Sequence, residues 1–150
     1  MAEEVSENTL QKLIMEYNFY KAQADLIQQE LYIVGASIDQ LRITAETLEG
    51  IIRGEGRDEI LIPIGGRAFL KAKLVDHENV IINVGANVAI LKPIEQAKQF
   101  IENRIAELQN IKMQRENLLA QLLARMSELQ RQIQSIAEKL QQQRVQQKGQ

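Results

Sequence analysis

The chain of 150 residues contains no cysteine, no tryptophan and a single histidine. Without cysteine it has neither a disulfide framework nor a thiolate nucleophile, a composition that fits a reducing compartment. The histidine, His77, stands in a polar stretch, and no motif brings it together with other metal ligands or catalytic groups. We therefore expect an ordinary turn residue at His77, no enzyme activity, no cofactor, no metal and a cytoplasmic location.

Aromatic residues are also scarce, at 4% of the chain, and neither sign of charge dominates. The 18 lysines and arginines nearly balance the 20 aspartates and glutamates, so no strong field exists to gather phosphates or anionic lipid. No apolar run approaches the roughly 18 to 20 residues that a membrane span requires. The sequence predicts no nucleic-acid partner and no membrane partner.

The apolar residues that are present follow a line instead of forming clusters. In the first third of the chain they are spaced alternately three and four apart, which places them on one stripe that a lone helix would leave in water. This pattern predicts a coiled-coil helix over about residues 7–52, beginning around Ser6 to Thr9 and ending in Gly50, Gly54 and Gly56. The stripe comprises Leu10, Leu13, Tyr17, Tyr20, Ala24, Ile27, Leu31, Val34, Ile38, Leu41, Ala45, Leu48 and Ile52.

A second helix with the same repeat is predicted over about residues 93–147, opened by Pro93, because proline is favoured at the first helical position. Pairing Ile52 with Ile94 predicts an antiparallel two-helix coiled coil with Leu10 near Ile136 and both termini at one end. Lys98, Lys112 and Arg115 interrupt its stripe, which predicts a local change in winding. The stripe comprises Ile94, Ile101, Ile105, Leu108, Leu119, Leu122, Met126, Leu129, Ile133, Ile136 and Leu140.

Between the helices the apolar period changes from 3.5 to 2, which predicts strands over about residues 59–91. Gly65-Gly66 is the expected tight turn of a first β-hairpin, since glycine adopts positive φ freely. Gly85-Ala86-Asn87 is the expected turn of a second one. The predicted fold class is α+β: a long antiparallel two-helix coiled coil with two β-hairpins between the helices.

Isolated hairpins with apolar faces are unstable in water. We expect the helices not to cover them, because the helical stripes already face each other. The cover would then come from other chains, and the hairpins would form an oligomeric β-barrel platform. The expected oligomerisation residues are Ile60, Ile62, Ile64, Phe69, Leu70, Leu74, Val80, Ile82, Val84, Val88 and Ile90.

The end of the coiled coil where the termini meet is rich in apolar residues that a partner could reach, and Glu3, Glu4 and Glu7 are expected to meet Lys139, Arg144 and Lys148 there. A surface of this kind would bind unfolded chains without sequence preference. The expected client-binding residues are Leu10, Leu13, Ile14, Ile133, Ile136, Leu140 and Val145. A further apolar row lies on the outer face of the first helix, where it fits a neighbouring coiled coil, tolerated surface residues or client capture: Met15, Phe19, Ala22, Leu26 and Ile33.

The central run EILIPIGGRAFLKAKLVDHENVIINVGANVAILKP, between two coiled-coil helices, resembles the alpha class of prefoldin subunits. The resemblance rests on Pro63-Ile64-Gly65, Phe69, Leu74-Val75-Asp76 and Val84-Gly85, and on the presence of a second hairpin, which beta-class subunits lack. It implies a single prefoldin-like domain over residues 1–150 in a hexamer of two alpha-class and four beta-class subunits. It also implies an ATP-independent holdase that captures unfolded proteins and delivers them to a group II chaperonin. A structural scaffold, or a filament-forming relative without client binding, would have the same fold.

Overall fold

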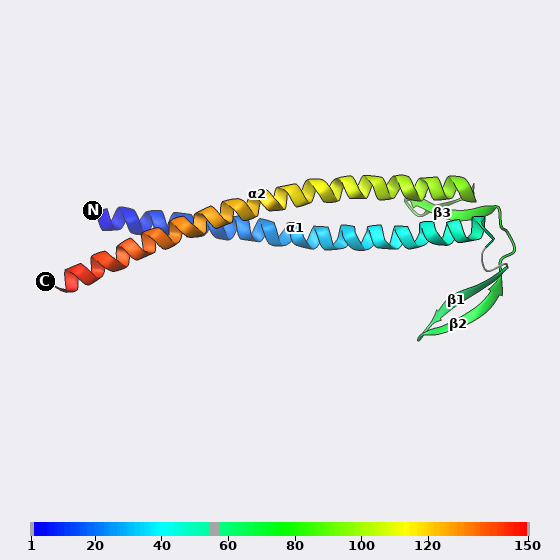
Figure 1. Cartoon of the computed structure of the whole chain (residues 1–150), viewed down its shortest axis with the longest axis horizontal. Helices are drawn as coiled ribbons and strands as arrows, with labels where there is room; N and C mark the ends of the chain where they lie inside the picture. Colours follow the sequence, from blue (N-terminus) through cyan, green and yellow to red (C-terminus); the bar gives the residue numbers. More distant parts are fainter. Residues whose placement is uncertain (1, 55–57, 150) are drawn as a thin grey trace. The chain divides into compact units, whose positions relative to one another are not determined.

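The computed structural model describes residues 2–54 and 58–149, so the expected turn glycine Gly56 and the side chains of Glu3 and Glu4 lie outside its description. Two long helices enclose two separate antiparallel strand pairs in the sequence, which confirms the α+β fold class (Figure 1). The elements are, in chain order, α1 (Ala2–Ile52), β1 (Glu59–Gly65), β2 (Ala68–Lys73), β3 (Asn79–Gly85), β4 (Val88–Pro93) and α2 (Ile94–Lys148).

The ends of the helices differ from the prediction by a few residues. Helix α1 begins at Ala2, so the start expected around Ser6 to Thr9 is wrong, and this stretch lies inside the helix. Gly50 also lies inside α1, whereas Gly54 has φ 71° in the turn that follows. Pro93 is the last residue of β4, and α2 begins one residue later than predicted. The difference of one residue at the start of α2 is ordinary, because helix ends fray, whereas the start of α1 differs from the prediction by more than that.

The turn of the first hairpin is displaced by one residue from the predicted one. Gly65, with φ 99°, pairs with Ala68, and the two loop residues are Gly66 and Arg67, with φ 56° and 63°. The register shifts between Pro63 and Gly65, so the intervening residue forms a bulge. Gly65, which follows the bulged Ile64, has a φ in the region that disfavours a Cβ atom, so glycine is suited to this position.

The second hairpin repeats this arrangement. Gly85, with φ 110°, pairs with Val88, and the loop residues Ala86 and Asn87 have φ 50° and 61°. Two consecutive residues with positive φ give a hairpin loop the twist that matches its strands. The two hairpins therefore have the same turn geometry although their loop sequences differ.

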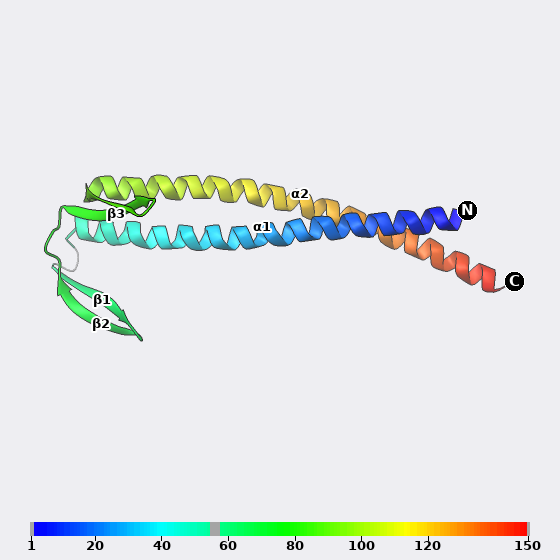
Figure 2. The ribbon, with the colours of Figure 1, turned by 180° about the vertical axis from the view of Figure 1, so that it is seen from behind.

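The described residues form two compact units. We call residues 2–34 with 111–149 the terminal unit, and residues 35–54 with 58–110 the hairpin unit. In the terminal unit the first part of α1 lies beside the last part of α2 (Figures 1 and 2), which confirms the antiparallel pairing there. Its buried residues are Ala24, Ile27, Leu122, Leu129 and Leu140.

The hairpin unit has a core formed by both helices and the second hairpin. Leu48 of α1 and Ile94, Ala97 and Ile101 of α2 are buried together, and Val80 and Ile82 of β3 pack against this cluster. Figures 1 and 2 accordingly show β3 beside the helices, whereas β1 and β2 stand apart from them. The expectation that the helices cannot cover the hairpins is therefore wrong for the second hairpin. Ala97, whose small side chain is fully buried, belongs to the cluster against which β3 packs.

Candidate interaction surfaces

The residues expected to mediate oligomerisation separate into two groups in the structure. One group is half-buried within the chain: Ile60, Leu74, Val80, Ile82 and Ile90. The other group is exposed: Ile62, Ile64, Phe69, Leu70, Val84 and Val88. Only the exposed group, most of which lies in the first hairpin, has its apolar surface free for another chain.

One face of the first hairpin is apolar across both strands. Ile60 is paired with Ala72, and Ile62 with Leu70, so these side chains share one face of the two-stranded sheet. The opposite face is mixed, since it carries Lys71 beside apolar residues. A two-stranded sheet of this kind gains stability by packing its apolar face against a further element.

The corresponding face of the second hairpin is covered by the helices of the same chain. Val80, Ile82 and Ile90 are half-buried on the side of the helices, while Ile81 and Leu91 form an exposed pair on the outer face. Neither residue of this exposed pair is among the expected oligomerisation residues. The alternation along β3 and β4 could have located it, because neighbouring residues of a strand point to opposite faces.

A hollow of about 600 Å³ lies in the hairpin unit between the end of β3 and the helices. Arg104 and Glu107, at its rim, form an ion pair of 3.0 Å. The hollow leaves Val84 partly uncovered although Ile82 beside it packs into the core. The lining residues are Leu41, Ile82, Asn83, Val84, Gly85, Phe100, Ile101, Asn103, Arg104 and Glu107.

The loop between the hairpins is fixed by a carboxylate. Asp76 accepts hydrogen bonds from the backbone N–H groups of Glu78 and Asn79, at 2.9 and 3.0 Å, and these bonds lower the pKa of its carboxyl group. His77, in the same loop, lies with Nε2 3.1 Å from Oδ1 of Asp58. Both are exposed polar contacts of the kind that hold a turn.

Ion pairs join the two helices in both units, and in each pair the acid belongs to α1 and the base to α2. In the hairpin unit Lys98 donates a hydrogen bond to Glu49, which lowers the pKa of Glu49 and raises that of Lys98. In the terminal unit the pairs are Glu30–Arg115 at 3.2 Å, Glu16–Arg125 at 3.1 Å and the predicted Glu7–Arg144 at 2.9 Å. The basic residues that interrupt the apolar stripe of α2 at Lys98 and Arg115 therefore serve as interhelical partners.

The residues expected to bind clients are mostly part of the helix–helix contact in the terminal unit. Leu140 is buried, and Leu10, Leu13, Ile133 and Ile136 are half-buried. Ile14 and Val145 are the members of this set that are exposed. Leu13 lines one groove together with Ile136, and Leu10 lines the neighbouring groove together with Ala137 and Leu140, so Leu10 lies near the predicted part of α2.

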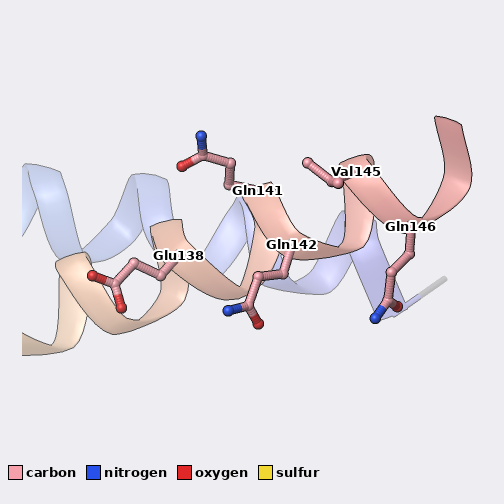
Figure 3. Close-up of a pocket in the computed structure, with 5 residues that line it drawn as sticks. All are labelled: Glu138, Gln141, Gln142, Val145 and Gln146. Atoms are coloured by element: carbon pink, nitrogen blue, oxygen red, sulfur yellow. The ribbon is translucent and has the colours of Figure 1, made fainter. Parts of the chain in front are cut away.

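Two open grooves of about 620 Å³ run between the helices in this unit. Both have mixed linings of polar and apolar side chains, and the apolar ones are Leu13 and Ile136 in one groove and Leu10, Ala137 and Leu140 in the other. A third hollow, of about 420 Å³, is lined entirely from α2, and Figure 3 shows Val145 there among glutamine side chains. Leu10, Leu13 and Ile136 therefore remain reachable from solvent along the grooves, whereas Ile133 lines neither groove.

The outer row of α1 is exposed to solvent. We define it as Met15, Phe19, Ala22, Leu26 and Ile33. The exposed fractions of its four large side chains are 71, 60, 61 and 64% in chain order. Seam residues of the same helix, such as Ala24 and Ile27, are buried. Helix α1 therefore carries two apolar stripes, of which one faces α2 and the other faces solvent.

Within residues 2–54 and 58–149, no three His, Cys, Asp or Glu side chains gather where they could hold a metal ion. In the same part of the chain neither helix has a segment that is both long and apolar enough to cross a membrane.

Comparison with known proteins identifies the architecture. A family model described as "Prefoldin subunit" matches residues 20–143. Prefoldin subunit alpha of Pyrococcus horikoshii is 34% identical over 131 residues, which are 87% of this chain and 88% of that protein. Prefoldin subunit alpha 1 of Thermococcus kodakarensis is 39% identical over 107 residues, 71% of this chain and 72% of that protein.

A solved structure has the same fold. A chain of filamentous PFD from Methanocaldococcus jannaschii, determined by cryo-EM, matches with a TM-score of 0.63 and 28% identity, over 77% of this chain and 95% of that one. The predicted resemblance is thereby confirmed over most of the sequence. The chain has two coiled-coil helices with two hairpins between them, and the relatives that it matches are prefoldin subunits. The chain therefore belongs to the prefoldin family, a family of chaperones.

Proposed function

We propose that this chain is the alpha-class subunit of a cytoplasmic, ATP-independent holdase, in which residues 1–150 act as one prefoldin-like domain. In this proposal two alpha-class and four beta-class subunits form the assembly, whose hairpins build a β-barrel platform. The coiled coils capture unfolded proteins and deliver them to a group II chaperonin.

The observation that carries the proposal is the presence of two open grooves in the terminal unit of a prefoldin-family chain, each of which exposes apolar side chains among polar ones. Apolar contact is non-directional, so grooves of this kind suit clients of many sequences. The proposed client-binding residues remain Leu10, Leu13, Ile14, Ile133, Ile136, Leu140 and Val145, with Ile14 and Val145 reached first because they are exposed.

Assembly is proposed to use the exposed apolar face of the first hairpin. Ile62 and Leu70 are paired on this face and expose 44 and 56% of their surface. Burying one such side chain at an interface contributes roughly 1.5 to 3 kcal/mol. Several such side chains buried on each subunit would together stabilise the platform.

The test of the holdase is truncation of the terminal unit. The purified assembly lacking residues 1–14 and 134–150 is expected to keep its oligomeric mass but to lose suppression of the aggregation of a chemically denatured protein. A control lacking only residues 146–150 retains every proposed client-binding residue and should protect the client. If the truncated assembly protects as well as the full-length one, the terminal unit does not capture clients.

A second candidate function is a filament-forming scaffold, which is favoured by the match to a chain of filamentous PFD. Its discriminating measurement is electron microscopy and mass determination of the chain alone and with a beta-class partner. Filaments formed by the chain alone, together with no protection of a denatured client, would favour the scaffold over the holdase.

A further inference from the structure

We propose that the seam of the two-helix coiled coil is interrupted at the boundary between the two units, so that the terminal unit opens while the hairpin unit stays folded. The boundary falls between Val34 and Gly35 in α1 and between Asn110 and Ile111 in α2. The inference rests on the proposed holdase function only for its consequence, which is that opening uncovers the half-buried client-binding residues. The opening itself is tested without a client.

Gly35 lies in the interior of a long helix, where glycine is unfavourable. Helix α1 is continuous from Ala2 to Ile52, and Gly35 is not among the residues with positive φ. A Cβ atom added at Gly35 would meet nothing within 4 Å beyond its chain neighbours and the backbone of its own helix. Neither φ nor the close approach of another element therefore requires glycine here, and its remaining effect is to make the helix easier to unfold at this point.

The buried part of the seam is also interrupted at the boundary. In α2 the widest interval between successive buried residues runs from Leu108 to Leu122, and in α1 the interval from Ile27 to Ile38 spans the boundary as well. The structure describes every residue of these two intervals. The seam residues inside them, such as Leu119, are half-buried. Less apolar surface is thus removed from water here, so the helices are held together less firmly than on either side.

Charged residues replace apolar ones in the same part of α2. Lys112 and Arg115 occupy positions of the apolar stripe, whereas the apolar Ile111 and Leu118 each lie one residue before a stripe position and are exposed. Arg115 is joined to Glu30 of α1 at 3.2 Å, with side chains 45 and 51% exposed. An exposed ion pair contributes less than the burial of a leucine, so this pair does not restore what the seam lacks.

The two units on either side of the boundary are unequally supported. In the hairpin unit β3 packs against a cluster of buried residues from both helices, which includes Leu48 and Ile101. The terminal unit consists of helix alone, and open grooves run between its two helices. Parts of a protein with few buried apolar contacts open at a lower free-energy cost than its core. The terminal unit is therefore the one that opens first.

The test is hydrogen exchange of the purified full-length assembly without a client, followed by mass spectrometry of its peptides. Amides of residues 15–31 and 119–133 are expected to share one protection factor, at least about tenfold lower than that of residues 41–48 and 97–108. Fraying from the ends would instead give protection that rises gradually with distance from the termini. A gradual rise of this kind, or one protection factor for all four segments, would overturn the proposal.

Matched variants assign the interruption to the boundary. Gly35→Ala with Lys112→Leu repairs both the helix and the stripe, and it should raise protection of the terminal unit at least about fivefold, since alanine is more favourable than glycine in a helix and leucine adds burial. Thr44→Ala with Gln114→Leu is the control, because both positions are exposed, away from Gly35 and off the stripe. It should change this protection less than about twofold. Equal effects of the two double variants, or no effect of the repair, would overturn the proposal.

This inference and the proposed holdase function can fail separately. Hydrogen exchange uses no client, so its result decides the opening whether or not the assembly protects a denatured protein. Where the assembly does protect, the repaired variant at native oligomeric mass should protect less well, because its client-binding residues are uncovered less often. Undiminished protection by a repaired variant whose exchange is slowed would overturn the link between opening and capture.

Discussion

The two hairpins have the same local structure and opposite surroundings. Each contains a glycine with positive φ before a two-residue loop and a register shift at that glycine. Ile82 of the second hairpin nevertheless packs against the helical core, whereas Ile62 at the corresponding place in the first is exposed. Local sequence therefore suffices to form both hairpins, while packing decides which of them belongs to the core of the chain and which is free for partners.

The largest expected difference concerns a charge placed on the covered face. Ile82→Asp should lower the free energy of unfolding by roughly 3 to 5 kcal/mol, because it removes apolar burial and leaves a carboxylate beside the core. Ile62→Asp should change the unfolding of the helices little. Urea denaturation followed by circular dichroism measures both. Equal losses for the two variants would remove the distinction between a covered and a free hairpin.

For assembly we expect the larger loss from the substitution in the first hairpin. Ile62→Asp should cost roughly 1.5 to 3 kcal/mol of interface burial per copy, before the cost of the charge, and light scattering should show a reduced mass. Leu61→Asp is the matched control, because Leu61 is exposed on the opposite face of the same strand beside Lys71. A native mass for Ile62→Asp would place the interface elsewhere.

A smaller effect is expected from the loop residues with positive φ. Asn87→Arg should destabilise the chain by about 1 kcal/mol, because asparagine tolerates the left-handed region better than arginine does. Arg67→Asn should leave unfolding of the helices unchanged and strengthen the assembly by a similar amount. Thermal unfolding tests the prediction for Asn87→Arg, and the concentration dependence of the oligomeric mass tests the prediction for Arg67→Asn. Equal shifts of the thermal midpoint would indicate that both loops belong to one cooperative core.

The smallest effect is expected from pH, at the ion pair in the hairpin unit. The pKa of Glu49 is lowered from 4.5 by its hydrogen bond with Lys98, so its contribution to stability is present above pH 4.5 and is lost as the pH falls through the lowered pKa. Glu49→Gln should therefore lower the thermal midpoint slightly at neutral pH and not at strongly acidic pH. A variant whose deficit persists unchanged in acid would show that the ion pair contributes nothing.

The exposure of the proposed client-binding residues was predictable from the sequence in outline but not in detail. The residues expected to bind clients are apolar and lie near both ends of the chain, and the structure buries Leu140 and leaves Val145 exposed. Periodicity alone assigns a residue to a stripe, whereas exposure depends on the exact register of the partner helix. The outer row was visible in the sequence because its spacing differs in phase from the seam.

The sequence by itself determined the two helices, the two hairpins and the family, because periods of 3.5 and 2 are local properties that survive without knowledge of packing. The tertiary structure decided that Val80 and Ile82 lie on the helical core and that Ile62 and Leu70 do not. One hairpin packs against the buried cluster of the two helices. Which hairpin does so depends on contacts between residues far apart in the chain, and a periodic pattern carries no information about them.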